Sequence, residues 1–228
     1  MGYNSDMDFI HALNRGVDGR DIFQDRQDYA RFVHDMYEFN DASPAVHLER
    51  RRQLSHSPSS DLRSRTLLVD IHGWCLMKNH YHLLLSEKVD GGITLFLRKL
   101  NVGYAKYFNE RYKRIGTLFQ GRTKKISIEH DAHLLYILQY IHLNPLDYLP
   151  GAKEWRIRSR GTFRNTKRAL KYLKTYRWSS YLDYCGEKNF PSLLTTNFFN
   201  DPSEQYEGLI RDYLKGAEGS PQQPLILE

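Results

Sequence analysis

Apolar residues in the first two thirds of the chain recur at spacings that predict alternating strands and helices. Residues 8–16 (DFIHALNRG) form an apolar run closed by a turn signal, which predicts a strand. Residues 26–39 carry apolar side chains at helical spacing, namely Tyr29, Phe32, Val33 and Met36. The polar, serine-rich residues 40–65 have no sustained period, so we expect an exposed loop there.

The same reasoning extends to residue 145. The elements expected are a hairpin at 66–87, a helix at 91–114, a strand or bent hairpin at 116–128 and a helix at 130–145. The hairpin breaks at Lys78-Asn79, and Pro145 stops the last helix. The order is βαββαβ plus one helix, so we expect an α+β, ferredoxin-like fold with one antiparallel sheet and helices on one face.

The composition changes after residue 149. Residues 153–177 hold many lysines and arginines but only one acid, Glu154. The whole chain has 33 basic and 27 acidic residues, so this local excess, more than the total, indicates a polyanionic partner. We expect a core at 1–149 and a basic helical extension at 150–228 packed on the same domain.

The cysteine positions and the hydropathy pattern argue against disulfide-stabilised, cysteine-zinc and membrane proteins. Cys75 and Cys185 stand far apart, which argues against a disulfide framework and a cysteine zinc site. No signal pattern or membrane-length apolar run is present, so we expect a soluble cytoplasmic protein without a membrane partner.

Two histidines separated by one residue lie in the apolar stretch MKNHYHLLL, at residues 77–85. Residues two apart on a strand share a face, so His80 and His82 can bind one ion while Tyr81 faces the other way. Such a pair is by itself also compatible with ordinary hydrogen-bonded histidines in a sheet.

The helix expected at 130–145 adds two more polar groups. Tyr140 and Asn144 are four residues apart and share a helix face. Imidazoles and a carboxamide oxygen suit a divalent metal, Mg or Mn, with positions left open for a phosphate.

Four ordered motifs, MKNHYHLLL, LFQGRTKK, YIHLNP and YRWSSY, resemble those of single-tyrosine HUH transposases, in particular the REP-associated tyrosine transposases. The resemblance runs from about His11 to Tyr184. It implies that His80 and His82 hold a divalent metal, with Asn144 as the third ligand.

The resemblance also implies an activity. Tyr140 would attack single-stranded DNA and form a 5′-phosphotyrosine, so the chain would be a metal-dependent endonuclease and strand transferase, acting on hairpin or palindromic repeat DNA. We expect a monomer or homodimer. The chain departs from the family pattern at Tyr81, at Lys78 and after the NP pair, where a basic residue is missing.

Basic and polar residues near the predicted catalytic helix and in the extension are candidate DNA contacts. They are Gln120, Arg122, Lys124, Lys125, Arg158, Arg160, Arg164, Lys167, Arg168 and Lys171. Aromatic residues interleaved in the basic tract could stack on bases or pack into the core.

Other assignments compete with these. Tyr136 could be the nucleophile, but the position four residues later is Tyr140 and not a polar ligand. We expect structural or surface roles for His72, His133 and His142. The alternative function is a catalytically inert nucleic-acid-binding module of the same fold, which would bind repeat DNA or RNA.

Overall fold

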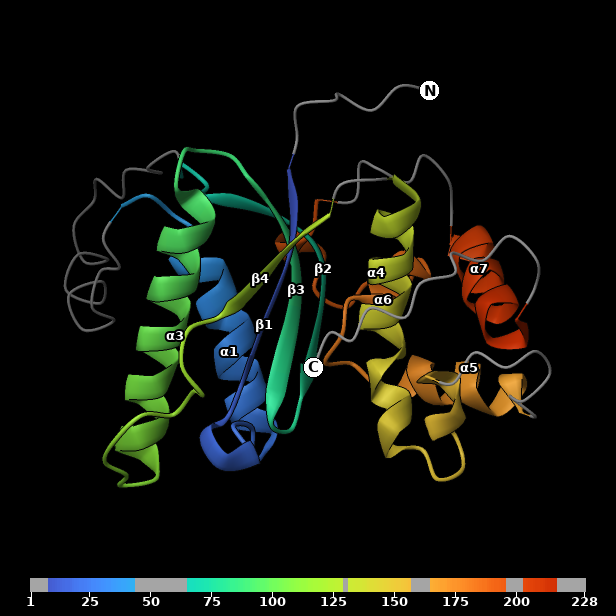
Figure 1. Cartoon of the computed structure of the whole chain (residues 1–228), viewed down its shortest axis with the longest axis horizontal. Coiled ribbons are helices and arrows are strands. Elements are labelled where there is room, and N and C mark those ends of the chain that lie inside the picture. Colours follow the sequence, from blue (N-terminus) through green and yellow to red (C-terminus); the bar gives the residue numbers. More distant parts are fainter. Residues whose placement is uncertain (1–7, 44–64, 129–130, 157–164, 196–202, 217–228) are drawn as a thin grey trace, which may run out of the picture.

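The computed structural model describes residues 8–43, 65–128, 131–156, 165–195 and 203–216 (Figure 1). Most of the loop expected at 40–65 lies outside these ranges. No helix in the described ranges combines the length and apolarity needed to cross a bilayer.

One antiparallel sheet forms the centre of the molecule. Its strands are β1 (Phe9–Arg15), β2 (Val69–Met77), β3 (His80–Glu87) and β4 (Lys124–Ile128), in the order β2-β3-β1-β4. This order confirms the expected α+β fold with a βαββαβ core. Of the segment 116–128, expected to be a strand or bent hairpin, only Lys124–Ile128 forms a strand, because the chain turns at Gly121, whose φ is 74°.

The first face of the sheet is covered by α1 (Arg26–Phe39) and α3 (Gly92–Arg111). Asp25 caps α1 by accepting from the backbone N–H groups of Gln27 and Asp28. The two helices approach closely at Gly103, where an added Cβ would lie 2.4 Å from the Phe39 ring. Both helices therefore pack on the same face of the sheet, as expected.

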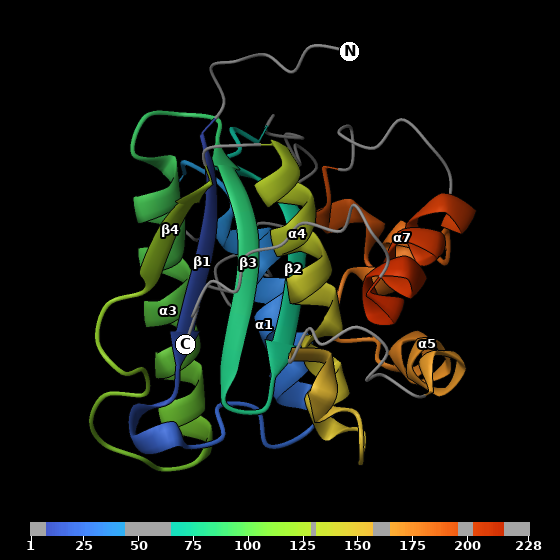
Figure 2. The same ribbon diagram turned by 45° about the vertical axis from the view of Figure 1, so that its right-hand side comes forward.

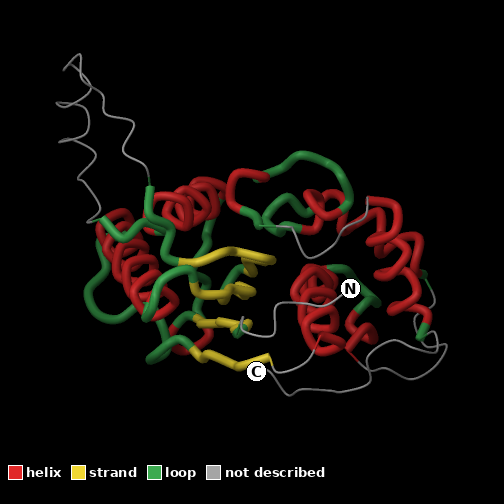
Figure 3. Tube along the Cα trace, turned by 90° about the horizontal axis from the view of Figure 1, so that it is seen from above, coloured by secondary structure: helices red, strands yellow, loops and turns green. Residues whose placement is uncertain are grey.

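The second face is covered as well, which corrects the expectation of helices on one face. There α4 (Asp131–Leu143) lies over β2 and β3, while β1 and β4 extend beyond it (Figure 2). Strand residues on this face, among them Cys75, Met77 and Leu84, are apolar and buried and therefore need a cover. Viewed from above, helices flank the strands on both sides (Figure 3).

Part of the chain after α4 packs behind that helix. Its helices are α5 (Thr166–Thr175), α6 (Tyr181–Tyr184) and α7 (Ser203–Lys215). The 3-10 turns of the described residues are η1 (Val17–Gly19), which precedes α1, and η2 (Asn144–Tyr148), η3 (Lys153–Arg156) and η4 (Pro191–Leu193), which follow α4. Leu170 of α5 and Ile210 of α7 belong to the same apolar cluster as α4. The division at residue 149 stays a prediction.

Candidate active site

The two histidines of β3 point to the α4 side of the sheet. His82 is fully buried and His80 half-buried, and their ring centroids lie 4.9 Å apart. Tyr81 points the other way, where its hydroxyl donates to Asn101 Oδ1 at 2.8 Å. The strand alternation therefore places both imidazoles on one face.

Each histidine contacts a neighbour through its Nδ1 atom. His82 Nδ1 lies 3.0 Å from Nε2 of the buried His11 on β1, and His80 Nδ1 lies 2.7 Å from Asn79 Oδ1. His82 Nε2 is buried and has no hydrogen-bond partner among the described residues.

Burial favours the neutral imidazoles of His82 and His11. It lowers the pKa of His82 well below its ordinary value, and the nearby His80, His11 and Arg156 lower it further. Burial, with a smaller contribution from His133, lowers the pKa of His11 to about 3. A neutral imidazole can coordinate a metal without first losing a proton.

Tyr140, the expected nucleophile, lies on α4 next to the rings of His82 and His11. Its ring centroid is 5.7 Å from that of His82 and 6.2 Å from that of His11, both in edge-on orientation. The helix is held there by apolar neighbours such as Ile137 and Ile141, which are fully buried. The structure thus brings Tyr140 and His82 together from sequence positions far apart.

Asn144 lies one turn further on, at the start of η2, and is fully buried. Its Nδ2 donates to the carbonyl oxygen of Tyr140 at 2.8 Å. Its Oδ1, the atom expected to reach a metal, accepts from Arg156 Nη2 at 3.0 Å. In this conformation the amide oxygen is therefore engaged by a guanidinium.

Arg156, at the end of η3, connects the polar groups of this segment. Its Nη1 donates to the hydroxyl oxygen of Tyr140 at 2.9 Å, and its Nε and Nη2 donate to the Asp147 carboxylate at 3.1 and 2.6 Å. Burial would lower the pKa of Arg156, but Asp147 and Tyr140 raise it above its ordinary value. Asp147 therefore fixes the guanidinium against the phenol.

The competing residues take other positions. The Tyr136 ring lies 6.3 Å from Tyr213 of α7 and 6.5 Å from Tyr140, between centroids. His142 is buried, with Nδ1 2.6 Å from the Tyr206 hydroxyl and Nε2 2.7 Å from Ser180 Oγ. His72 contacts Ser86 Oγ and the Thr195 carbonyl, and the His133 ring stacks 6.3 Å from Tyr136.

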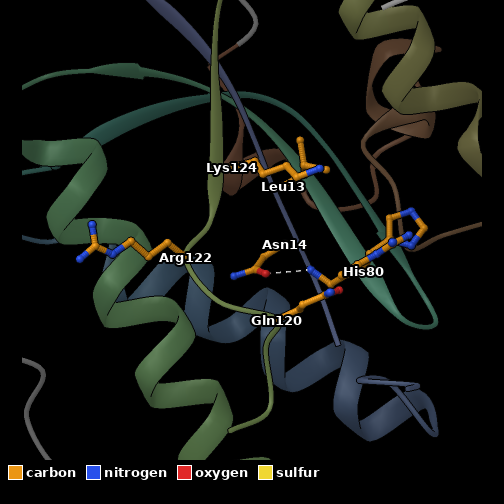
Figure 4. A pocket seen from close by; sticks show the side chains of 7 residues that line it. Leu13, Asn14, His80, Gln120, Arg122 and Lys124 are labelled. Atoms are coloured by element: carbon orange, nitrogen blue, oxygen red, sulfur yellow. Dashed lines mark hydrogen bonds between the residues drawn. The ribbon is translucent and has the colours of Figure 1, made fainter. Parts of the chain in front are cut away.

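A pocket lined mainly by polar and charged residues opens beside His80 (Figure 4). It is lined by Leu13, Asn14, Arg15, His80, Gln120, Arg122 and Lys124. Three of the candidate DNA contacts thus gather next to a predicted metal ligand. Lys125 lies apart from them, because it faces α3 and donates to Thr94 Oγ1 at 3.0 Å.

The remaining candidate contacts lie in the extension. Lys167, Arg168 and Lys171 are exposed on α5, whereas Arg158, Arg160 and Arg164 lie outside the described residues. Trp155 is 3% exposed and packs against Tyr140, which removes it from the aromatic residues able to stack on bases.

Two residues near the site were not singled out from the sequence. His11 follows the strand alternation, but its contact with His82 depends on a strand register that only the fold sets. Arg156 is one of many cations in the basic tract, and Asp147 lies shortly after the NP pair, in the segment where the resemblance led us to expect a basic residue. That departure was the available signal for an ion pair.

Among the side chains of the candidate site, the imidazoles are the groups that fit a divalent metal. Within the described ranges no three His, Cys, Asp or Glu side chains converge on a metal-sized space. The fit therefore depends on the imidazole of His80, on the neutral His82 with its buried Nε2 atom and on the amide oxygen of Asn144.

Comparisons with known proteins found a family match over part of the chain. Residues 63–144 match the family model described as Transposase IS200 like. No curated protein matches the chain. A solved structure of a REP-associated tyrosine transposase bound to a REP hairpin is 11% identical, with a TM-score of 0.44, and the alignment covers 99% of this chain and 96% of that one. Over residues 63–144, which include both histidines of β3, Tyr140 and Asn144, the chain is similar to the IS200-like transposases.

Proposed function

We propose that the chain is a metal-dependent DNA endonuclease and strand transferase in which Tyr140 is the nucleophile. The observation that carries the proposal is the position of the Tyr140 ring, edge-on to the buried His82. The match of residues 63–144 to IS200-like transposases supports a transposase-type function.

Tyr140 performs the bond exchange. Its hydroxyl oxygen attacks a backbone phosphorus, the bond from phosphorus to the 3′-oxygen breaks, and the hydroxyl proton is lost as the departing 3′-oxygen gains one. The product is a 5′-phosphotyrosine, which a 3′-hydroxyl can later attack to rejoin DNA. Mg or Mn held by His80, His82 and Asn144 would polarise a non-bridging phosphate oxygen.

Arg156 places a positive charge where negative charge builds up. Its guanidinium donates to the phenol oxygen at 2.9 Å and is held there by Asp147. A preorganised donor of this kind stabilises charge that develops on the attacking oxygen without having to reorganise.

The proposed substrate is single-stranded or hairpin DNA. The pocket next to His80 carries the exposed cations Arg122 and Lys124, and α5 adds Lys167, Arg168 and Lys171. Phosphate contacts of this type position a strand without reading its sequence. β1 and β4 extend beyond α4 (Figure 2), and a DNA strand bound there would reach the pocket beside His80.

The test is a covalent adduct. We expect the wild type, incubated with a labelled DNA hairpin and Mg²⁺ or Mn²⁺, to form a denaturation-resistant protein–DNA adduct on the peptide containing Tyr140. Tyr140→Phe removes only the hydroxyl, so it should abolish the adduct and retain DNA binding. Tyr136→Phe is the matched control and should form the adduct; the opposite pattern would identify Tyr136 as the nucleophile.

A second candidate is a catalytically inert nucleic-acid-binding module. The observation that favours it is the engagement of both Tyr140 Oη and Asn144 Oδ1 by Arg156. Wild-type protein that binds hairpins but forms no adduct with either metal would support this candidate over the enzyme.

A further inference from the structure

The two histidines of β3 share one feature that the proposed reaction does not require by itself. In each ring the Nδ1 atom contacts a side chain next to the site. These side chains are Asn79 in the β2–β3 turn and His11 on β1.

For His80 the contact specifies where the proton lies. Asn79 Nδ2 donates to the carbonyl oxygen of Gly19 at 3.3 Å, which orients the amide so that Oδ1 faces the ring. An amide oxygen only accepts, so His80 Nδ1 must carry the hydrogen. In the neutral ring the lone pair is then on Nε2.

For His82 the partner is another imidazole. His11 Nε2 and His82 Nδ1 lie 3.0 Å apart, and the rings stack at an interplanar angle of 19°. Of two neutral imidazoles in contact, one nitrogen donates and the other accepts. A metal on His82 Nε2 requires that His82 Nδ1 donates and His11 Nε2 accepts.

We infer that His11 and Asn79 are positioning residues that hold His82 and His80 as Nδ1–H tautomers and so direct both Nε2 lone pairs to the metal. The inference deepens the proposed function and depends on its metal site. Both residues act through the ligands, since His11 and Asn79 bind the β3 histidines on the atom opposite to the one that coordinates.

The first test needs no metal and no substrate. Long-range ¹H–¹⁵N correlation spectra of the metal-free wild type report which ring nitrogen of each histidine carries the proton. We expect Nδ1–H for both His80 and His82. An Nε2–H tautomer at His82 overturns the role of His11, and this outcome requires no variant to fold.

The second test measures Mn²⁺ affinity by calorimetry. His11→Leu removes the acceptor and should weaken Mn²⁺ binding about 10- to 100-fold, the usual effect of removing such a partner. His11→Gln can present an amide oxygen to His82 Nδ1 and should restore most of the affinity. Asn79→Ala should weaken binding to a similar degree through His80.

Controls separate this inference from the proposed function. His80→Ala and His82→Ala should abolish Mn²⁺ binding. If they bind like the wild type, the proposed metal site is wrong. If they fail to bind while His11→Leu retains wild-type affinity and His82 stays an Nδ1–H tautomer in that variant, the metal site stands and the positioning role is overturned.

Discussion

At the scale of a single residue, Arg156 contacts two groups of the candidate site. It donates to the Tyr140 hydroxyl oxygen, the proposed attacking atom, and it also occupies the amide oxygen of Asn144 that the proposed metal needs. A guanidinium and a divalent ion cannot share that oxygen without repulsion. Binding of the proposed metal through Asn144 would therefore require Arg156 to release the amide oxygen.

We predict that Arg156→Gln binds Mn²⁺ more tightly than the wild type, by about tenfold, because a charged hydrogen-bond competitor is removed. Arg156→Lys keeps the charge and should change the affinity less. Calorimetric titration of both variants checks this. Unchanged affinity in Arg156→Gln, together with intact binding in Asn144→Ala, would remove Asn144 from the ligand set.

The sequence predicted the contact between Tyr140 and His82 through the resemblance, but it did not predict their partners. His11 meets His82 across 71 residues of chain, and Arg156 meets Tyr140 across 16. Both contacts depend on tertiary packing, which the periodic spacing of apolar residues along the sequence does not reveal. Strand register sets the first, and the return of the chain through η2 and η3 sets the second.

At the scale of elements, the strand and helix order was predictable because apolar spacing is a local property. The side of the sheet that α4 covers was not, since the pattern of β3 is apolar on both faces. Tyr81, Leu83 and Leu85 pack toward α1 and α3, while Leu84 packs toward α4. A strand that is apolar on both faces predicts helices packed on both faces of the sheet, whereas the ferredoxin-like order alone predicts helices on one face.

The exposed basic face of α5 provides a prediction for DNA binding. Reversing the charge of Lys167, Arg168 and Lys171 together should flatten the fall of log K with log salt, by about 0.7 in slope for each DNA phosphate that these side chains no longer neutralise. Filter binding of a labelled single strand across salt concentrations measures the slope.

The matched control for α5 lies on α3, which covers the opposite face of the sheet. Arg98 and Lys106 are exposed there, and Lys113 follows the helix. Reversing these three charges should leave the slope close to that of the wild type. Equal effects of the two triple variants would mean that only net charge matters and would contradict a DNA path over α5.

At the scale of the whole molecule, buried histidines make the fold sensitive to acid. Burial lowers the pKa of His142 from 6.5 to about 3, and it also lowers the pKa values of His11, His72 and His82. Below pH 6.5 the unfolded chain takes up protons that the folded chain excludes. The free energy of unfolding must therefore fall as the pH drops from about 6.5 toward 3.

Replacing one of these groups tests the sign of the effect. Between pH 7.5 and 5.5 a histidine shifted this far contributes about 1.4 kcal/mol to the decrease in stability. His142→Gln cannot titrate, so its decrease over that interval should be smaller than the wild-type decrease by about this amount. Urea unfolding at the two pH values measures both decreases, and equal values would show that His142 is protonated in the folded state.

The two apolar clusters on either side of the sheet also set an order in time. The cluster under α1 and α3 is built almost entirely from residues before β4 ends, whereas the cluster on the histidine face takes most of its members from α4 onward. On the ribosome the first layer can thus close while the second is still unmade. A stalled nascent chain exposed to residue 129 should resist proteolysis across α1 and α3 and yet lack Tyr140, the proposed nucleophile, so under the proposed mechanism the growing polypeptide could not cut DNA before α4 has been translated.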